Sequence, residues 1–336
     1  MEQHADIKCS YESYRKLFNT KFNLSFGYPR KDTCSKCDEL DSKAESAETD
    51  EEKEAISREK EEHLRLAEVF YARKKSKRDQ AKRDSSHIAI AFDFWKNLPV
   101  PNITTNDVYY KRQLSVYTFN VHTLHNNDVE LFCYDETVAR KGADEVCSML
   151  YERFSSVADD VKTAHLFCDG CAGQNKNWTV IRFLYFLVHA ICMFSEITVS
   201  FPVRGHSYME CDKDMGNVNQ KSKALLPQHW RTEFQQARKH PSPMKVKDMS
   251  TGRFLAVEAA LEPYFRKKCL FKTRPVREIR VSSCEPGKIM HRNNWNGEFT
   301  QSPAFRVNQK HDLPQIEFKQ AYSAALPISK AKYKDL

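Results

Sequence analysis

Glycine is scarce in this chain of 336 residues, which has only nine. Neither GxGxxG nor GxxxxGK followed by Ser or Thr occurs, so the glycine-rich backbone that cradles phosphates in dinucleotide and P-loop sites is missing. We therefore expect no nucleotide cofactor. A long hydrophobic run is lacking too: the longest apolar stretch, Val180 to Phe194, contains Arg182 and His189 and is shorter than the ~18 uncharged residues that a membrane span needs. This stretch predicts a buried helix and no membrane partner.

A secretory signal is also missing from the N-terminus, where residues 1–16 hold no apolar segment behind a basic start. The eleven cysteines are an odd number scattered over a long chain, which favours reduced thiols in a cytosolic or nuclear protein over a disulfide framework. The net charge of +8 permits binding to a polyanion such as nucleic acid.

Composition divides the chain into three regions. Residues 1–85 contain a stretch without Gly or Pro, 38–83, that is dense in Glu, Lys, Arg and Ala and predicts one or two exposed helices. Its apolar positions recur near a 3.6-residue period, so one side is expected to pack on the body. Residues 86–226 alternate between strand and helix patterns, whereas 227–336 carry weaker patterns. We interpret 227–336 as a smaller accessory α+β region.

The middle region predicts a mixed sheet with helices on its faces. Its first three strands are expected to be antiparallel and sequential, and helical crossovers then lead to parallel strands. The resulting order, βββαβαβα, is that of an RNase H-like α/β fold. We expect strands at 87–94, 109–124, 129–139, 163–169, 196–203, 277–283 and 314–319, and helices at 143–157, 177–194, 212–226 and 229–240.

Two aspartates occupy strands that are otherwise apolar. Asp93 lies within HIAIAFDF, and Asp169 ends HLFCD; in the predicted strand order these two ends are neighbours. A buried charge is costly unless it is paired or binds a cation, and Mg²⁺ or Mn²⁺ held by carboxylates can activate both oxygens of a phosphodiester cleavage. The pattern predicts a divalent-metal site for nucleic-acid hydrolysis or strand transfer. A third carboxylate is expected on the helix after the fifth predicted strand. Asp212 is better placed there than Asp214, although both could be ordinary helix N-terminal acids.

Polar residues follow the fourth and fifth predicted strands. Gln174, Asn175 and Lys176 come directly after the fourth strand, and His206 comes after the fifth. We predict that they contact DNA phosphates, because amide and ammonium donors at a helix N-terminus bind phosphate oxygens. In the alternative interpretation, Asn175 or Asn177 caps the next helix and His206 hydrogen-bonds within a turn.

A CxxC pair in the N-terminal region predicts a zinc site. Cys34 and Cys37 are spaced so that two thiolates on one turn reach the same ion. His63, on the inward side of the charged stretch, is the predicted third ligand, and the alternative is a half-buried helix histidine. The fourth ligand is left open among Cys9, His4 and His87.

Aromatic and basic residues alternate in the segment 11–31, which predicts either a DNA-docking segment or, as we favour, an amphipathic helix packed on the core. The basic run RKKSKR at 73–78 is typical of a nuclear-import sequence. We therefore expect the nucleus as location and DNA as partner.

Six further runs of sequence are distinctive. Together they resemble a family of transposon-derived proteins abundant in insect genomes, which is similar to cut-and-paste transposases with an RNase H-like DDE core. The resemblance implies a DNA nuclease and strand-transfer protein that uses divalent metal and allows self-association. The runs are YRKLFNTKFNLSFGYPRKDTCSKCDEL, FDFWKNLPVP, YYKRQLSVYTFNVH, DETVARKGADEVCSML, CDGCAGQNKNWTV and FPVRGHSYMECDKDMG.

One position departs from the resembled family. There, the run after the Gly-His-Ser motif continues as aspartate, a short spacer, Phe-Gly and then Ile-Glu, whereas Asn219 stands here in place of the glutamate. If that glutamate is the third ligand, a neutral amide binds Mg²⁺ weakly, and the chain is a catalytically inactive DNA- or protein-binding module. If Asp212 is the ligand, the set of three carboxylates is intact.

Overall fold

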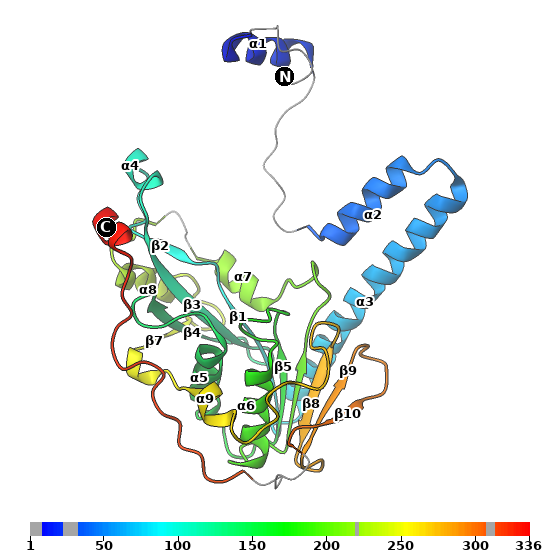
Figure 1. The fold of residues 1–336 in the computed structure, drawn as a ribbon, viewed down its shortest axis with the longest axis vertical. Coiled ribbons are helices and arrows are strands. Elements are labelled where there is room, and N and C mark those ends of the chain that lie inside the picture. Colours follow the sequence, from blue (N-terminus) through cyan, green and yellow to red (C-terminus); the bar gives the residue numbers. More distant parts are fainter. Residues whose placement is uncertain (1–8, 23–32, 219–221, 307–312) are drawn as a thin grey trace.

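A single mixed sheet organises the protein. The computed structural model describes residues 9–22, 33–218, 222–306 and 313–336. Within them, ten strands join in one sheet, shown in Figure 1. The strands are β1 (His87–Phe94), β2 (Leu98–Val100), β3 (Leu114–Thr123), β4 (Asp128–Asp135), β5 (Thr163–Phe167), β6 (Glu196–Ser200), β7 (Lys245–Asp248), β8 (Glu278–Ser282), β9 (Lys288–Arg292) and β10 (Thr300–Pro303).

The strand order runs β10-β9-β8-β6-β5-β1-β3-β4-β7, with β2 beside β3. As predicted, β1, β3 and β4 are sequential and antiparallel, and β5 and β6 follow as parallel strands on the other side of β1. The strand β1 occupies the residues that the sequence predicts, because its apolar run is bounded by polar residues on both sides. It is the central strand that separates the antiparallel half from the parallel half.

Helices cover both faces of this sheet. The helices within the described residues are α1 (Tyr11–Lys21), α2 (Ser35–Ser46), α3 (Asp50–Arg83), α4 (Asn106–Tyr109), α5 (Ala143–Phe154), α6 (Trp178–His189), α7 (Glu210–Gly216), α8 (Pro227–Gln236), α9 (Val257–Leu261) and α10 (Lys330–Asp335). Alternate residues of β1 face opposite layers: Ile88, Ile90 and Phe92 join the core that contains α5 and α6, whereas Ala89 and Ala91 pack in the layer of α3. Asp93 has the parity of these two alanines.

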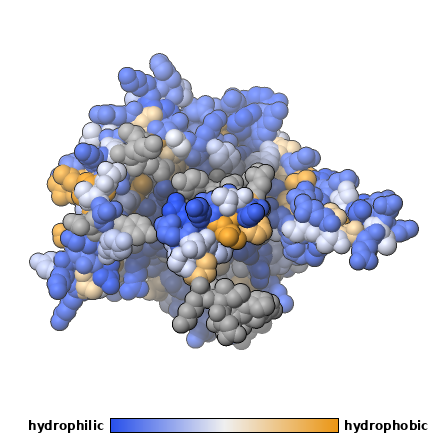
Figure 2. Space-filling model, turned by 90° about the horizontal axis from the view of Figure 1, so that it is seen from above, coloured by the Kyte–Doolittle hydropathy of each residue, from blue (hydrophilic) through white to orange (hydrophobic). Residues whose placement is uncertain are grey.

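The helices α2 and α3 form an arm that projects from the body, as Figures 1 and 2 show. A capping box of Thr49 and Glu52 begins the 34-residue helix α3. Its C-terminal half packs on the sheet through Phe70, which is fully buried, and through an ion pair between Arg73 and the buried Glu278. Lys74 pairs with Glu210 at 2.7 Å. Two cations of the predicted import run thus fasten α3 to the body.

Three expectations about packing and secondary structure differ from the structure. The helix α1 buries none of its residues and lies apart from the body in Figure 1, so this part of the predicted segment 11–31 does not contact the core, and residues 23–31 lie outside the described residues. The segment 314–319 is irregular and forms no strand. The predicted helix at 212–226 is the shorter α7, which ends at Gly216.

The C-terminal region is integrated with the middle region. Its strands extend both edges of the same sheet: β7 pairs with β4 at one edge, and β8 pairs with β6 at the other. Its helix α9 joins α5 and α6 in one core. Residues 227–336, predicted as an accessory region, therefore contribute to the central architecture.

Figure 2 shows a mostly hydrophilic face, with the arm reaching to one side. Among the residues that the structure describes, no helix combines the length and the apolar character needed to cross a membrane. The apolar helix α6, predicted from the longest apolar run, is buried along nearly its whole length.

Candidate metal centre and carboxylate site

Two cysteines and two histidines meet where the arm joins the body. Cys34 precedes α2, Cys37 lies in its first turn, His63 comes from α3, and His206 lies in the loop between β6 and α7. Their ligand atoms all lie within 4.8 Å of one another. Cys34 Sγ is 3.2 Å from His63 Nε2, Cys37 Sγ is 3.4 Å from His206 Nε2, and the two histidine Nε2 atoms are 3.1 Å apart. This cluster could hold a metal such as zinc.

The donor set and its spacing fit a tetrahedral ion. Zn–S bonds near 2.3 Å and Zn–N bonds near 2.0–2.1 Å place neighbouring ligand atoms roughly 3.3–3.8 Å apart. The three distances are close to that range, so small shifts would complete the coordination. The combination of two thiolates and two imidazoles is one that structural zinc sites use.

A glycine lets the loop from the body reach the cysteines. Gly205 has φ +87°, and a Cβ there would lie 2.6 Å from Cys34 Sγ, so a side chain is excluded for both conformational and steric reasons. Tyr71 of α3 donates a hydrogen bond to the His206 carbonyl at 3.0 Å. The backbone of the 201–209 loop is therefore held against α3 independently of any ion.

Burial sets the ionisation of the cluster. It raises the pKa of the Cys37 thiol, and Cys34 beside it adds to this effect. Burial and then the neighbouring His206 lower the pKa of His63, which favours the neutral imidazole that ligates metal. Because thiols must lose protons when they bind, metal affinity is expected to rise with pH.

The structure brings the three sequence-predicted zinc ligands together and adds His206 as the fourth member. His206 was expected at a DNA phosphate. Cys9 is exposed and its thiol faces the Ser10 carbonyl, while His87 packs on His165, with ring nitrogens 3.2 Å apart. His4 lies outside the described residues. His87 and Cys9 are therefore replaced by His206 as the candidate.

Substitution of this fourth member gives a direct test. We expect His206→Ala to weaken zinc binding at least tenfold, because it removes one of four donors. His87→Ala, a histidine of similar partial burial outside the cluster, should leave zinc binding unchanged. Competition with a chromophoric chelator measures both. Equal zinc affinities in the two variants would show that His206 is not a ligand.

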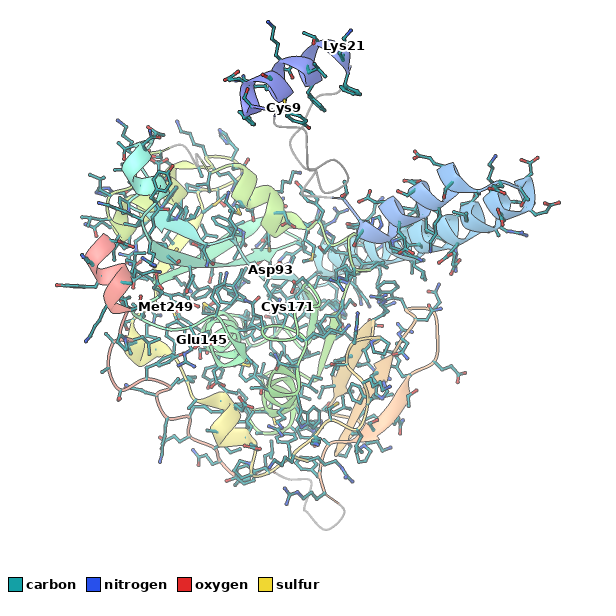
Figure 3. The ribbon with its side chains drawn as sticks, turned by 45° about the horizontal axis from the view of Figure 1, so that its top comes forward. Cys9, Lys21, Asp93, Glu145, Cys171 and Met249 are labelled. Carbon is teal, nitrogen blue, oxygen red and sulfur yellow. The ribbon has the colours of Figure 1, made fainter. Side chains whose placement is uncertain are left out.

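The predicted catalytic aspartates lie at one edge of the sheet. Ala91 of β1 pairs with Phe167 of β5 in the parallel register. Asp93 and Asp169 each follow two residues later, so they lie side by side at the ends of neighbouring strands. Figure 3 labels Asp93 and Cys171, and the backbone N–H of Cys171 donates to Asp169 at 3.1 Å. Asp93 and Asp169 are partly buried, and Asp212 is exposed. The site therefore opens to solvent.

Asp212 reaches this edge because α7 is fixed to β1 and β3. Buried Trp95, just after β1, donates to the Cys211 carbonyl at 2.9 Å. Asp214 lies in a buried network, where His122 Nδ1 is 2.7 Å and Asn120 Nδ2 is 3.0 Å from its carboxylate. Asp214 is therefore an internal structural acid, and Asp212 is the carboxylate of α7 whose charge acts on the site.

The three carboxylates repel one another. The pKa of Asp93 is raised to about 8, first by burial, then by the charge of Asp169 and, less, by that of Asp212. Lys141 opposes this shift, but its ammonium donates to the Trp95 carbonyl and to Asn97 at 3.1 and 2.9 Å. Among the described residues, the Cys/His cluster is the one group of three or more ligands within 4.8 Å, so the aspartates are spaced more widely.

The polar residues after β5 face the interior. Asn175 is 1% exposed and donates to Asp169 at 2.6 Å, which positions that carboxylate. Lys176 is 5% exposed, and its ammonium donates to the carbonyls of Arg274 and Val276. The DNA contact predicted for Asn175 and Lys176 stays a prediction, and in this structure both side chains are buried and bonded within the protein. Gln174 is partly exposed. Asn177 caps α6 by accepting from Val180 N–H, as the alternative interpretation predicts.

One family model matches the chain: a domain of unknown function, DUF7869, over residues 115–291. Because the match covers more than half of the 336 residues, the chain belongs to the DUF7869 family. No curated protein matches the chain. The matched residues include Asp169, His206 and Asp212, whereas Asp93 and the CxxC pair precede them.

Proposed function

We propose that the protein is a transposase-derived DNA nuclease and strand-transfer protein, in which Asp93, Asp169 and Asp212 hold divalent Mg²⁺ or Mn²⁺. The convergence of three carboxylates at the ends of β1, β5 and the start of α7 carries this proposal. Bound divalent ions would activate the attacking and leaving oxygens of a phosphodiester. We propose the nucleus as its location, which suits a DNA substrate.

The fold supports the proposal at the level of strand order. The antiparallel β4-β3-β1 half joins the parallel β1-β5-β6 half at the central strand, as expected for an RNase H-like core. In that arrangement the first and fourth strands of the core carry the first two aspartates to the same edge. The helix α7, which packs beside β1 and β3, then supplies the third carboxylate, Asp212.

We further propose that the Cys/His cluster binds zinc and holds the loop that leads to Asp212. That loop has three connections to the arm: the cluster itself, the Tyr71–His206 hydrogen bond and the Lys74–Glu210 ion pair. Glu210 begins the helix that carries Asp212. Zinc would thereby position the third carboxylate without touching the substrate.

A second candidate function is a catalytically inactive DNA- or protein-binding module. Asn219 favours the inactive module, because it stands in place of the glutamate of the resembled transposon-derived family. This residue lies outside the described part of the chain. The inward-facing Lys176 favours it too, since that ammonium cannot reach a phosphate in this conformation.

Nicking of supercoiled plasmid separates the two candidates. The zinc-loaded protein should nick DNA when Mn²⁺ or Mg²⁺ is added and should be silent without either ion. If no nicking occurs with either ion while DNA is still bound, the inactive module is the correct description. Self-association, which strand transfer by transposases commonly needs, can be followed in the same samples by sedimentation.

The raised pKa of Asp93 predicts how stability depends on pH before Mg²⁺ or Mn²⁺ is added. The unfolded carboxyl ionises near 3.8, whereas the folded one keeps its proton until about 8. Between these values the folded state binds more protons, so stability falls with rising pH, by at most ~1.4 kcal/mol per pH unit. Asp93→Asn should flatten this slope. Urea unfolding at several pH values measures it, and an unchanged slope in the variant would remove Asp93 as the cause.

A further inference from the structure

An open cavity of about 500 Å³ lies at the other end of β1. The end of α3, the turn between β3 and β4 and the end of α5 surround it. The strand β1 runs from His87 at this cavity to Asp93 at the carboxylates, a span of about 20 Å at ~3.3 Å per residue. The cavity is therefore separate from the proposed nuclease site, and its volume is in the range of small-ligand pockets.

The charge of the lining is positive. Lys82, Arg83 and Arg153 line the cavity together with two histidines, and the described lining contains neither Asp nor Glu. Three carboxylates lie beside the lining. Asp84 is 3.5 Å from His87 Nε2, Asp128 pairs with Lys245 at 2.9 Å, and Glu130 is 2.9 Å from Lys247 and 3.8 Å from Arg153. Two of these acids are thus shared with cations outside the lining.

Arg153 is built into the wall of this cavity. It is 9% exposed, and its two terminal nitrogens donate to Ser156 Oγ and Thr123 Oγ1, both at 3.2 Å. Its Nε has no hydrogen-bond partner, and the Glu130 carboxylate lies 3.8 Å from it. A guanidinium that is buried, oriented and incompletely satisfied can bind an oxyanion at little further cost.

His125 supplies a second buried polar atom without a partner. Its Nδ1 is buried without a hydrogen-bond partner. Burial, then the charge of Arg153 and, less, that of Lys82 lower its pKa, and Asp128 opposes them. The lowered pKa favours the neutral ring. The hydroxyls of Ser85, Ser156 and Thr123 in the lining add groups that hydrogen-bond to phosphate oxygens.

We propose that this cavity binds a phosphate group, held by Arg153 and His125 at its wall and by Lys82 and Arg83 at its rim. The phosphate belongs either to a phosphorylated small molecule or to a DNA backbone, and both present the same oxyanion. The inference does not depend on the nuclease function, because none of its residues belongs to the carboxylate site.

Inorganic pyrophosphate tests the proposal, in calorimetry without added divalent cation so that the carboxylates cannot contribute. A 20-base-pair duplex is titrated in parallel. The exposed rim is changed in the double variant Lys82→Glu, Arg83→Glu, which should leave folding intact because both side chains are solvent-exposed. The matched control, Lys267→Glu with Lys268→Glu, makes the same charge change at two other exposed positions.

We expect the rim variant to bind pyrophosphate at least tenfold more weakly than the control does. If only the binding of the duplex is weaker in the rim variant than in the control, the phosphate site is supported and DNA is the source of the phosphate. Arg153→Lys keeps the charge but loses the planar guanidinium, and it should weaken the binding of the same ligand. The proposal is overturned if wild-type protein binds neither ligand, or if the rim variant and the control lose affinity equally.

Discussion

Asp169→Asn is expected to abolish metal-dependent nicking of DNA. The change removes a charged ligand while it keeps the side-chain volume, and Oδ1 of the asparagine can still accept from the Cys171 N–H and the Asn175 amide, as the aspartate does. Loss of residues that merely support a metal ligand costs about 10–100-fold. Loss of a ligand itself should therefore reduce the rate by at least about 10²-fold, measured as the conversion of supercoiled plasmid to open circles.

The matched control is Asp160→Asn, which makes the same charge change at an exposed position after α5. It should nick DNA at the wild-type rate. Relief of repulsion with Asp93 should also leave Asp169→Asn at least as stable as wild type before Mg²⁺ or Mn²⁺ is added. Cleavage that persists in Asp169→Asn would show that the activity comes from another part of the molecule or from a contaminant.

The double substitution Cys34→Ser, Cys37→Ser should release about one equivalent of zinc and destabilise the protein. A ligand that binds only the folded state contributes ~4 kcal/mol at 1,000 times its Kd. Its loss should lower Tm by on the order of 10 °C. Elemental analysis and thermal unfolding measure the two effects. Because the cluster holds the loop before α7, Mn²⁺ affinity at the aspartates should fall as well.

Two exposed cysteines provide a control in which the same Cys→Ser substitutions are made outside the cluster. Cys9→Ser with Cys284→Ser removes two solvent-accessible thiols outside the cluster and should change neither zinc content nor Tm. Undiminished zinc in the Cys34, Cys37 variant would refute the site. Zinc loss with unchanged Mn²⁺ affinity would leave the zinc site standing and remove its coupling to Asp212.

The central strands could be predicted from local pattern because their physical cause is local. HIAIAFDF is apolar on both faces, as expected of a strand covered by helices on both sides, and β1 has the predicted bounds. The short edge strands β7 and β10 have no buried residue and carry no such pattern. They form because the edges of the sheet offer unpaired backbone groups.

The site residues divide in the same way. Asp93 was found because an acid in a buried strand stands out in the sequence. His206 joins the cluster from 143 residues beyond His63 and 169 beyond Cys37, and no local pattern reports such a contact. Lys176 looks like a phosphate ligand in sequence, but two backbone carbonyls and the Phe201 ring, 4.6 Å from its ammonium, draw it inward. Lys141, beside Asp93, was missed because its neighbours in sequence are unremarkable.

Anomalous diffraction from crystals soaked in Mn²⁺ tests the central claim most directly, since manganese and zinc are distinguished at their own absorption edges. We predict a zinc peak among Cys34, Cys37, His63 and His206, and a manganese peak among Asp93, Asp169 and Asp212 that Asp169→Asn removes. Saturating Mn²⁺ without a peak at the three aspartates, or with its peak elsewhere, would contradict the proposed nuclease site.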